Sequence, residues 1–290
     1  MSVAVRAISD SDLPAVGEFL HTYLNPRVSA EAWARAPMVP WPDDGPNHGF
    51  LLTDEDAIVG VYLALYATRT IDGVDERFCN LGAWCVREDY RSHSVRLIRS
   101  LLAQKDYTFT DLSPSGTVVP LNERLKFEHL DTATVLIPGV PLPSRPFSSA
   151  PDRIHIRTDR RQIEAALTGT ELKLYRDHAA AAAAHHLLIT RGSDACYVIY
   201  RRDRRKNLPV FASILYVSNP EIFRAGVPRL SSHLLLRHGV LATLAELRVV
   251  SHRPRLSKLL SDPRRKMFKS SHLSPSQIDY LYSELVCVAW

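Results

Sequence analysis

The stretch Asn80-Leu-Gly-Ala-Trp-Cys-Val-Arg-Glu-Asp-Tyr-Arg-Ser-His-Ser-Val-Arg-Leu-Ile-Arg-Ser-Leu-Leu102 decides the fold of this chain. It begins as an apolar strand, continues through a short polar turn that opens with Tyr90-Arg91, and ends as an amphipathic helix. The N-terminus of a helix presents unpaired N–H groups and the positive end of the helix dipole, so a strand–turn–helix unit of this kind can bind a phosphate. The stretch therefore predicts a site for a nucleotide-type ligand.

Outward from this stretch, the apolar periodicity predicts a strand, two helices and two consecutive strands before the unit, and a strand, a helix and a closing strand after it. A helix that follows a strand implies a crossover to a parallel neighbour, so a mixed sheet is expected. The expected strands are 4–8, 49–53, 58–68, 78–86, 107–112 and 127–137, and the expected helices begin at 13, 29, 95 and 118.

A proline-rich segment near the middle of the chain predicts a domain boundary. Five prolines between 138 and 151 exclude a helix, so residues 1–138 and 152–290 are expected to form two domains joined by a linker over 139–151. The order of elements recurs in the second half in rougher form. The elements expected there are strands 154–156, 187–190, 196–200, 210–217 and 247–250, and helices 160–167, 171–184 and 228–244.

The composition is typical of a soluble globular protein, with 46% hydrophobic and 23% charged residues in 290. No apolar run is long enough to span a bilayer, and the N-terminus lacks the pattern of a signal peptide. The four cysteines show no Cys-x-x-Cys spacing, which favours buried thiols in a reducing compartment over disulfides or a metal site. A cytoplasmic location without a bound metal is expected.

The charge is unevenly distributed. Residues 1–149 carry 13 basic and 19 acidic side chains, whereas residues 150–290 carry 23 and 12. A basic half can bind an acidic partner, face an acidic domain or simply be solvated. The basic runs 201–206 and 264–266 raise the possibility of a nucleic-acid surface, although a hairpin turn at 201–206 favours a solvated turn.

Several segments together resemble the GNAT superfamily (Gcn5-related N-acetyltransferases). The opening 5–13, the segment 57–62, the turn 90–96 and the segment 122–127 match the family's pattern in order, over roughly residues 3–137. The second half resembles a divergent copy. The resemblance implies an α/β (α+β) fold of tandem GNAT-like domains, each with a mixed, mostly antiparallel sheet flanked by helices. It also implies an acyltransferase that uses acetyl-CoA or another acyl-CoA to modify an amine or hydroxyl of a small-molecule acceptor.

The resemblance assigns cofactor-binding roles in the first half. The strand 81–86 is expected to bind the pantetheine arm through its backbone. A backbone N–H from 83–85 is expected to polarise the thioester oxygen, and the turn 90–96 is expected to bind the pyrophosphate. The residues implied are Ala83, Trp84, Cys85, Val86, Arg91, Ser92, His93, Ser94, Val95, Arg96 and Ser115.

This sequence departs from the family's pattern in both halves. Ser94 and Arg96 stand where the pyrophosphate loop usually has glycines, so Arg96 either crowds the phosphates or supplies a cation to them. Asn122 stands where a tyrosine acid is usual, and an amide cannot deliver a proton at neutral pH. In the second half Pro228 falls at the loop and removes an N–H donor, which leaves the first half as the expected acyl-CoA site.

Other residues are candidates for the remaining catalytic and acceptor-binding roles. Glu76, with Asp75 beside it, is a candidate base acting through water, and a solvated turn is the alternative. Trp33 and Trp41 fall where the family usually binds its acceptor, and they can equally cover the core. Cys79 and Cys85 are expected to face the same side of one strand.

Two other classes of function stay open. The missing glycines and tyrosine allow a non-catalytic binding module, and the basic runs allow transfer from an aminoacyl-tRNA. Nucleic acid is the less expected partner, and the oligomeric state is not indicated by the sequence.

Overall fold

The computed structural model describes residues 3–142, 153–205 and 208–290, and the chain divides into two compact units. The first unit contains residues 1–130, 265–278 and 282–290, and the second contains 131–264 and 279–281. Residues 131–138 thus join the second unit, and most of 265–290 joins the first. Most of the expected linker lies outside the described residues.

The first unit is built on a mixed sheet of seven strands in the order β1-β2-β3-β4-β5-β14-β6. Only the β4–β5 pair is parallel, as the crossover through the helix after residue 86 requires. The strands are β1 Val3–Ala7, β2 Gly49–Asp54, β3 Ala57–Ile71, β4 Val74–Val86, β5 Thr108–Asp111, β6 Glu128–His129 and β14 Met267–Lys269.

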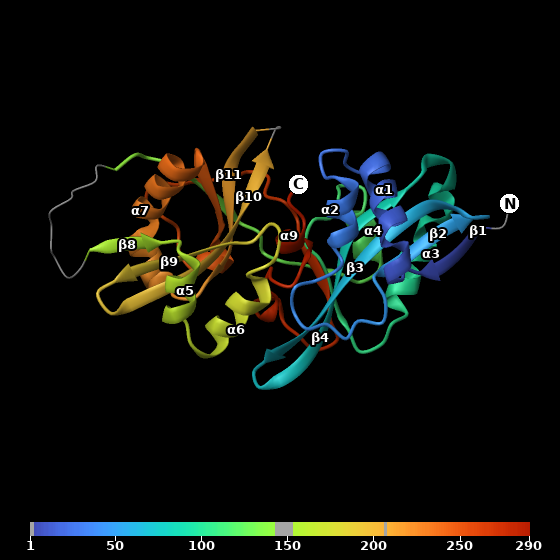
Figure 1. Cartoon of the computed structure of the whole chain (residues 1–290), viewed down its shortest axis with the longest axis horizontal. Coiled ribbons are helices and arrows are strands. Elements are labelled where there is room, and N and C mark those ends of the chain that lie inside the picture. The colour runs from blue at the N-terminus through green and yellow to red at the C-terminus, as the bar shows by residue number, and fades with distance from the viewer. Residues whose placement is uncertain (1–2, 143–152, 206–207) are drawn as a thin grey trace. The chain divides into compact units, whose positions relative to one another are not determined.

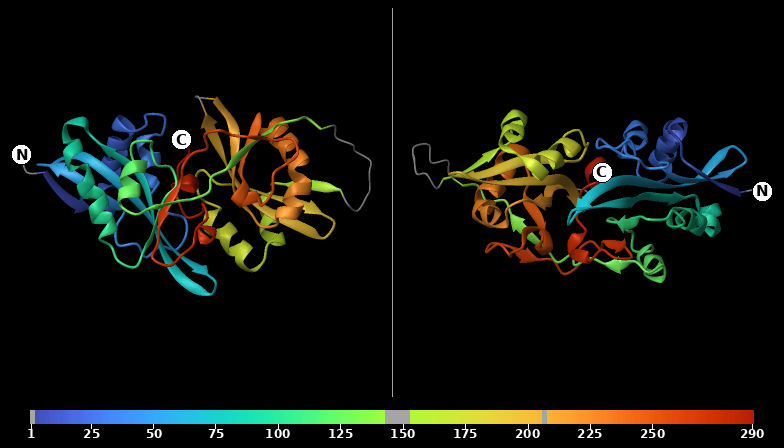
Figure 2. Two further views of the ribbon diagram at one scale, coloured as in Figure 1. Left: turned by 180° about the vertical axis from the view of Figure 1, so that it is seen from behind. Right: turned by 90° about the horizontal axis from the view of Figure 1, so that it is seen from below.

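Helices cover both faces of this sheet (Figures 1 and 2). Helices α1 and α2 lie on one face, and α3 and α4 lie on the other, where Leu97, Ile98 and Val119 join the core. The helices are α1 Leu13–Tyr23, α2 Ala30–Arg35, α3 Ser94–Leu102, α4 Val119–Arg124 and α9 Glu284–Cys287, with short 3-10 turns at Asp10–Asp12, Glu88–His93 and Pro275–Gln277.

The second unit repeats this plan with a seven-stranded sheet in the order β13-β7-β12-β11-β10-β9-β8. Helix α7 packs its apolar side on one face, where Phe223 and Leu230 are fully buried. The strands are β7 Thr134–Pro138, β8 Ile154–Arg157, β9 His185–Arg191, β10 Asp194–Arg205, β11 Leu208–Val217, β12 Ala242–Glu246 and β13 Lys258–Leu259, and the helices are α5 Arg160–Ala166, α6 Gly169–His178, α7 Pro220–His238 and α8 Leu247–Val250.

Four expected elements were wrong in type or extent. The strand 127–137 is two strands in different sheets, β6 and β7, because an irregular segment separates them. The helix 171–184 ends at His178, and the alanines after it form turns. Residues 247–250 form helix α8 rather than a strand.

The second-half helix expected over 228–244 instead runs from Pro220 to His238, so Pro228 lies inside it and not in a loop before it. Asn219 caps its start through its side chain, and Gly239 ends it with φ 67°.

Candidate functional site

Strand β4 carries a bulge at Ala83. Gly82 pairs with Leu63 and Trp84 pairs with Tyr62, so Ala83 is an extra residue in β4, and it adopts a φ of 50°. A left-handed backbone costs an alanine about 1 kcal/mol, which the surrounding pairing offsets. Bulges bend a strand and re-aim its groups, so the line of β4 changes at this residue.

Strands β4 and β5 separate just before the bulge. Their parallel pairing covers only Phe78 to Asn80 against Thr108 to Thr110, whereas β4 continues to Val86. Among the described strands, none pairs with the β5-facing edge of 81–86. An unpaired strand edge offers backbone N–H and C=O groups to an extended ligand that contains amides.

The second sheet repeats this bulge and separation. Tyr216 pairs with Ile199 and Ile214 pairs with Tyr200, which leaves Leu215 as an extra residue in β11. The parallel pairing of β11 with β12 also covers only three residue pairs. The likeness of the two halves therefore extends beyond the order of their elements to the local irregularity of their central strands.

The bulge also corrects the expected orientation of the cysteines. Cys79 packs in the core formed with α3 and α4, and Trp84 and Val86 lie against that same core. Because the bulge shifts the alternation by one residue, Cys85 faces the other side, and the expectation that both thiols share a face was wrong.

A buried carboxyl group lies at the point where β4 and β5 separate. Asp111 is the last residue of β5, and its Oδ2 accepts a 2.8 Å hydrogen bond from Nδ2 of Asn122 on α4. Burial, together with the nearby charge of Glu284, raises the pKa of Asp111 to about 7, and the bond from Asn122 opposes this shift. A carboxyl group with such a pKa can exchange a proton near neutral pH.

Glu284 reaches this point from the C-terminal segment. Its backbone N–H donates a 2.9 Å hydrogen bond to Oδ1 of Asn80, and its Oε1 accepts a 2.7 Å bond from Oγ of Ser113. A Cβ placed on Gly82 would lie 3.2 Å from the Cβ of Glu284, so helix α9 packs directly on β4 beside the bulge.

Asp111 and Glu284 were missed by the sequence reasoning. The available signals were an acidic residue closing the short apolar strand that ends at Asp111, and a glutamate inside the apolar C-terminal run 284–290.

The expected phosphate turn is helical. Residues Glu88–His93 form a 3-10 helix that leads directly into α3, and the N–H of Ser94 already bonds to the carbonyl of Arg91. The N–H groups that remain for an anion across 92–95 are therefore fewer than in an open loop.

The two arginines of this turn point to different partners. Arg96 turns to β1, where its Nη1 donates a 2.8 Å hydrogen bond to the carbonyl of Val3. The Arg91 side chain is 71% exposed, with its Nη1 3.5 Å from Oε1 of Glu88. Of the two guanidinium groups, that of Arg91 is the more accessible to a ligand.

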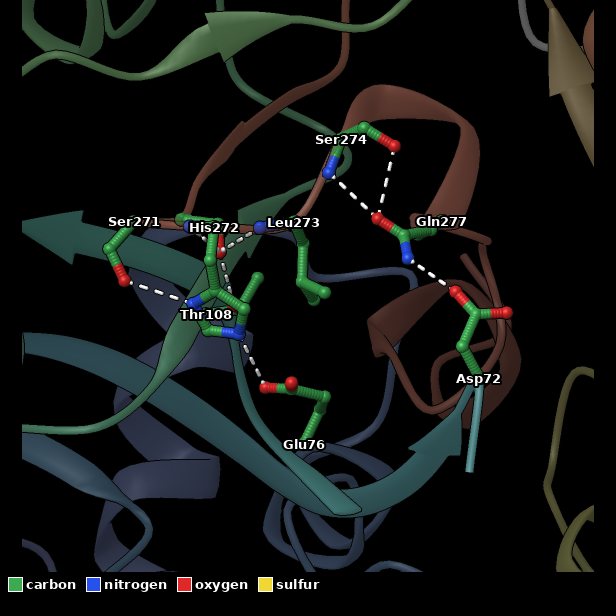
Figure 3. Close-up of polar contacts among 9 residues, drawn as sticks. Asp72, Glu76, Thr108, Ser271, His272, Leu273, Ser274 and Gln277 are labelled. Atoms are coloured by element: carbon green, nitrogen blue, oxygen red, sulfur yellow. Dashed lines mark hydrogen bonds and ion pairs between the residues drawn. The ribbon is translucent and has the colours of Figure 1, made fainter. Parts of the chain in front are cut away.

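Glu76 lies far along β4 from the bulge. Seven residues separate it from Ala83, which is about 23 Å at 3.3 Å per residue. Its Oε2 lies 2.8 Å from Nε2 of His272, and Nε2 of Gln277 donates a 2.7 Å hydrogen bond to Oδ2 of Asp72; dashed lines mark both contacts (Figure 3). These contacts hold the 270–278 segment against the β3–β4 hairpin. The structure therefore does not bring Glu76 together with Asn122, whose side chain contacts Asp111 at the end of β5.

The remaining candidates make packing and hydrogen-bond contacts. Trp33 and Trp41 are buried, and the Nε1 of Trp41 donates a 2.8 Å bond to the carbonyl of Tyr66. Their rings lie 5.9 Å from Trp290 and 5.1 Å from Tyr282, respectively, so both indoles hold the C-terminal segment. The Ser115 carbonyl accepts the N–H bonds of the first residues of α4, and its Oγ lies 3.1 Å from Thr117.

No family model matches this sequence, and no curated protein matches it. Solved structures do match it. A protein of Enterococcus faecalis described as a probable N-acyltransferase is 13% identical with a TM-score of 0.59, covering 92% of this chain and 72% of its own. A GCN5-related N-acetyltransferase from Anabaena variabilis is 12% identical with a TM-score of 0.57 and the same coverage.

The N-myristoyltransferase of Saccharomyces cerevisiae, solved with myristoyl-CoA, is 10% identical with a TM-score of 0.51, covering 100% of this chain and 86% of its own. These similarities establish the fold alone. The chain is an α+β protein with two seven-stranded mixed sheets flanked by helices, consistent with tandem GNAT-like domains, and the expected fold class is confirmed.

Two further observations concern the described residues. Within them, no helix has the length and apolar character needed to cross a membrane. They also contain no group of three or more His, Cys, Asp or Glu side chains placed to hold a metal ion.

Proposed function

We propose that this protein is an acyl-CoA-dependent acyltransferase that transfers an acetyl or other acyl group to an amine or hydroxyl of a small-molecule acceptor. The observation that carries the proposal is the unpaired edge of β4 at the Ala83 bulge, close to the buried carboxyl of Asp111. Three strand positions separate Ala83 from Asn80, which pairs with the residue before Asp111.

The residues present fit an acyl-CoA at this edge. The backbone of 81–86 would bind the amides of the pantetheine arm, and the Arg91 guanidinium with the remaining N–H groups at the start of α3 would bind the phosphates. When bound, the acyl-CoA supplies an acyl group activated as a thioester. Ala83 to Cys85 offer backbone N–H groups near the bulge that can stabilise negative charge on an oxygen.

Asp111 is the proposed base. Asn122 donates to its Oδ2, and the backbone N–H of Ser113 also bonds to this carboxyl group, so a proton from the acceptor would go to a lone pair that these two donors leave free. Because its pKa is about 7, the carboxylate is substantially populated at neutral pH and still basic enough to take a proton. Asn122 orients this carboxyl group and is thus a positioning residue.

A non-catalytic binding module is the second candidate. It is favoured by the packing of Glu284 on Gly82 and by the helical turn before α3, since both reduce the space and the N–H donors for a cofactor. The tRNA-dependent alternative loses support because Arg201 and Lys266 are buried, and Arg264 lies 3.4 Å from Asp203.

The decisive experiment combines binding with turnover. We expect acetyl-CoA at micromolar concentration to raise the melting temperature. Arg91→Ala should weaken this binding, whereas Arg99→Ala, on the exposed side of α3, should not. Release of CoA thiol over a panel of primary amines then measures transfer.

A base variant tests the chemistry separately. Asp111→Asn should lower kcat by 10²-fold or more with the Kd for acetyl-CoA unchanged, whereas Asp56→Asn in the exposed β2–β3 turn should change neither. Absence of both CoA binding and turnover in the wild-type protein would support the non-catalytic module instead.

A further inference from the structure

The second unit contains a cavity of about 950 Å³ that the proposed acyl transfer does not use. It lies between the end of β7, the first half of α7 and the loop that follows α8. This volume is at the upper end of the range for small-molecule sites. Its described lining residues all belong to the second unit, whereas Ala83 belongs to the first.

The walls of this cavity are mainly apolar. Eight of its thirteen lining residues are aliphatic or proline, so the interior favours a hydrocarbon over a polar ligand. Six of these eight apolar residues are Ile137, Val140, Leu142, Val227, Pro228 and Leu256. Leu256 and Val140 are 74% and 44% exposed, which marks an apolar entrance as well as an apolar interior.

Three arginines stand around these walls. Arg224 comes from α7, and Arg253 and Arg255 come from the loop after α8. All three are exposed, and none forms an ion pair or a side-chain hydrogen bond with another described residue. Among the described residues that line the cavity, no side chain is acidic, so nothing in the cavity wall balances these three positive charges.

His252 fixes the loop that carries two of these arginines. Its Nδ1 donates a 2.6 Å hydrogen bond to the carbonyl of Val250, and its ring lies 6.1 Å from that of Phe223 in an edge-to-face arrangement. Pro254, between Arg253 and Arg255, is buried. The loop is thereby held at its centre while both guanidinium groups stay exposed.

We propose that this cavity binds an amphipathic anion, a single alkyl chain that ends in a carboxylate or a phosphate. The chain would occupy the apolar interior, where burial contributes about 0.8 kcal/mol for each methylene. The head group would be held at the entrance by Arg224, Arg253 and Arg255, because guanidinium groups bind carboxylates and phosphates through paired N–H donors.

The test uses the full-length protein and a dansyl-labelled undecanoic acid, whose fluorescence rises when it enters an apolar site. We expect saturable binding, with displacement by dodecanoate or dodecyl phosphate and none by the uncharged dodecanol at equal concentration. A preference of tenfold or more between the two anions would identify which head group the site is built for.

Variants separate the charge from the cavity. Replacing all three arginines by alanine should weaken binding at least tenfold, whereas Arg237→Ala, at the other end of α7, should leave it unchanged. Ser231→Leu narrows the interior without changing charge and should also weaken binding, with thermal unfolding confirming that the variant is folded.

The outcomes that overturn the proposal are distinct from failure of the acyltransferase proposal. Equal displacement by dodecanol would show a non-specific apolar surface, and absence of saturable binding would show that the cavity is closed to ligands. Acetyl-CoA binding measured in parallel should be unaffected by the arginine variants, so either proposal can fail while the other stands.

Discussion

Nδ2 of Asn122 donates a 2.8 Å hydrogen bond to Oδ2 of Asp111, and both side chains are almost completely buried. The bond joins helix α4 to the last residue of β5, next to the point where β4 and β5 separate. An amide donor favours the ionised carboxylate, yet burial and the charge of Glu284 outweigh it and raise the pKa of Asp111 to about 7. Asn122 therefore acts on a neighbouring carboxyl group.

The raised pKa makes stability depend on pH. A carboxyl group whose pKa is higher in the folded state stabilises the fold while protonated, and this contribution is lost as pH rises from the unfolded value of 3.8 through about 7. Asp111→Asn removes this titration. From pH 5 to pH 8 we expect the wild type to lose about 2 to 3 kcal/mol of unfolding free energy relative to the variant.

Urea denaturation at several pH values measures this difference. Asp56→Asn, in an exposed turn, serves as the control and should run parallel to the wild type. If the wild-type and Asp111→Asn curves also run parallel, the carboxyl group does not have a raised pKa, and the proposed base loses its basis.

The parts of the fold that were predictable are local. The apolar strand and amphipathic helix between Asn80 and Leu102 carry their own periodicity, and both form as expected. The exchange of β7 and β14 between the two sheets was not predictable, because short strands such as Met267–Lys269 are defined by distant pairing partners rather than by their own pattern.

The site was less predictable than the fold, because it also depends on residues that are distant in the sequence. Asp111 and Glu284 are far apart in sequence, and neither belongs to a motif. Gly82 directly precedes the bulge and is a signal for one, but the side-chain alternation along β4 was continued through Ala83 as in a regular strand.

Asn80 connects the separated strands to the C-terminal segment. Its Oδ1 accepts the Glu284 N–H at 2.9 Å, and its Nδ2 donates to Oγ1 of Thr110 at 3.1 Å. Asn80→Ala would leave these buried groups without Asn80 as a partner, so we expect a loss of about 2 to 4 kcal/mol in unfolding free energy, measured by urea denaturation. Ser115→Ala removes a solvent-exposed hydroxyl and should cost less than 0.5 kcal/mol. Equal losses in the two variants would show that the buried contacts contribute nothing specific.

Gly49 allows β2 to approach β3 closely. It has a φ of 107°, and a Cβ there would lie 2.1 Å from the carbonyl oxygen of Tyr62. Gly49→Ala should therefore lower the unfolding free energy by about 3 kcal/mol or more, from backbone strain together with a clash. Gly73 has a φ of 83° but open space around it, so Gly73→Ala should cost only about 1 kcal/mol. Thermal and urea unfolding of this pair separate the clash from the strain, and similar losses would exclude the clash.

All four cysteines are buried and free, which decides how they react. Burial raises the pKa of Cys85 and of Cys196 to about 11 and those of Cys79 and Cys287 further still. Because the thiolate is the nucleophile, we expect the native protein at pH 8 to react with Ellman's reagent far more slowly than a free thiol, and four equivalents to react after denaturation.

The same measurement tests whether an acyl group passes through a cysteine. Cys85 is the thiol nearest the Ala83 bulge, and it faces away from the core that holds Cys79. Cys85→Ser should keep the rate of CoA release within a factor of about two, since a thiol held protonated takes no part in direct transfer. One fast equivalent in the native protein that disappears in Cys85→Ser, together with loss of transfer, would instead establish a covalent acyl-cysteine route.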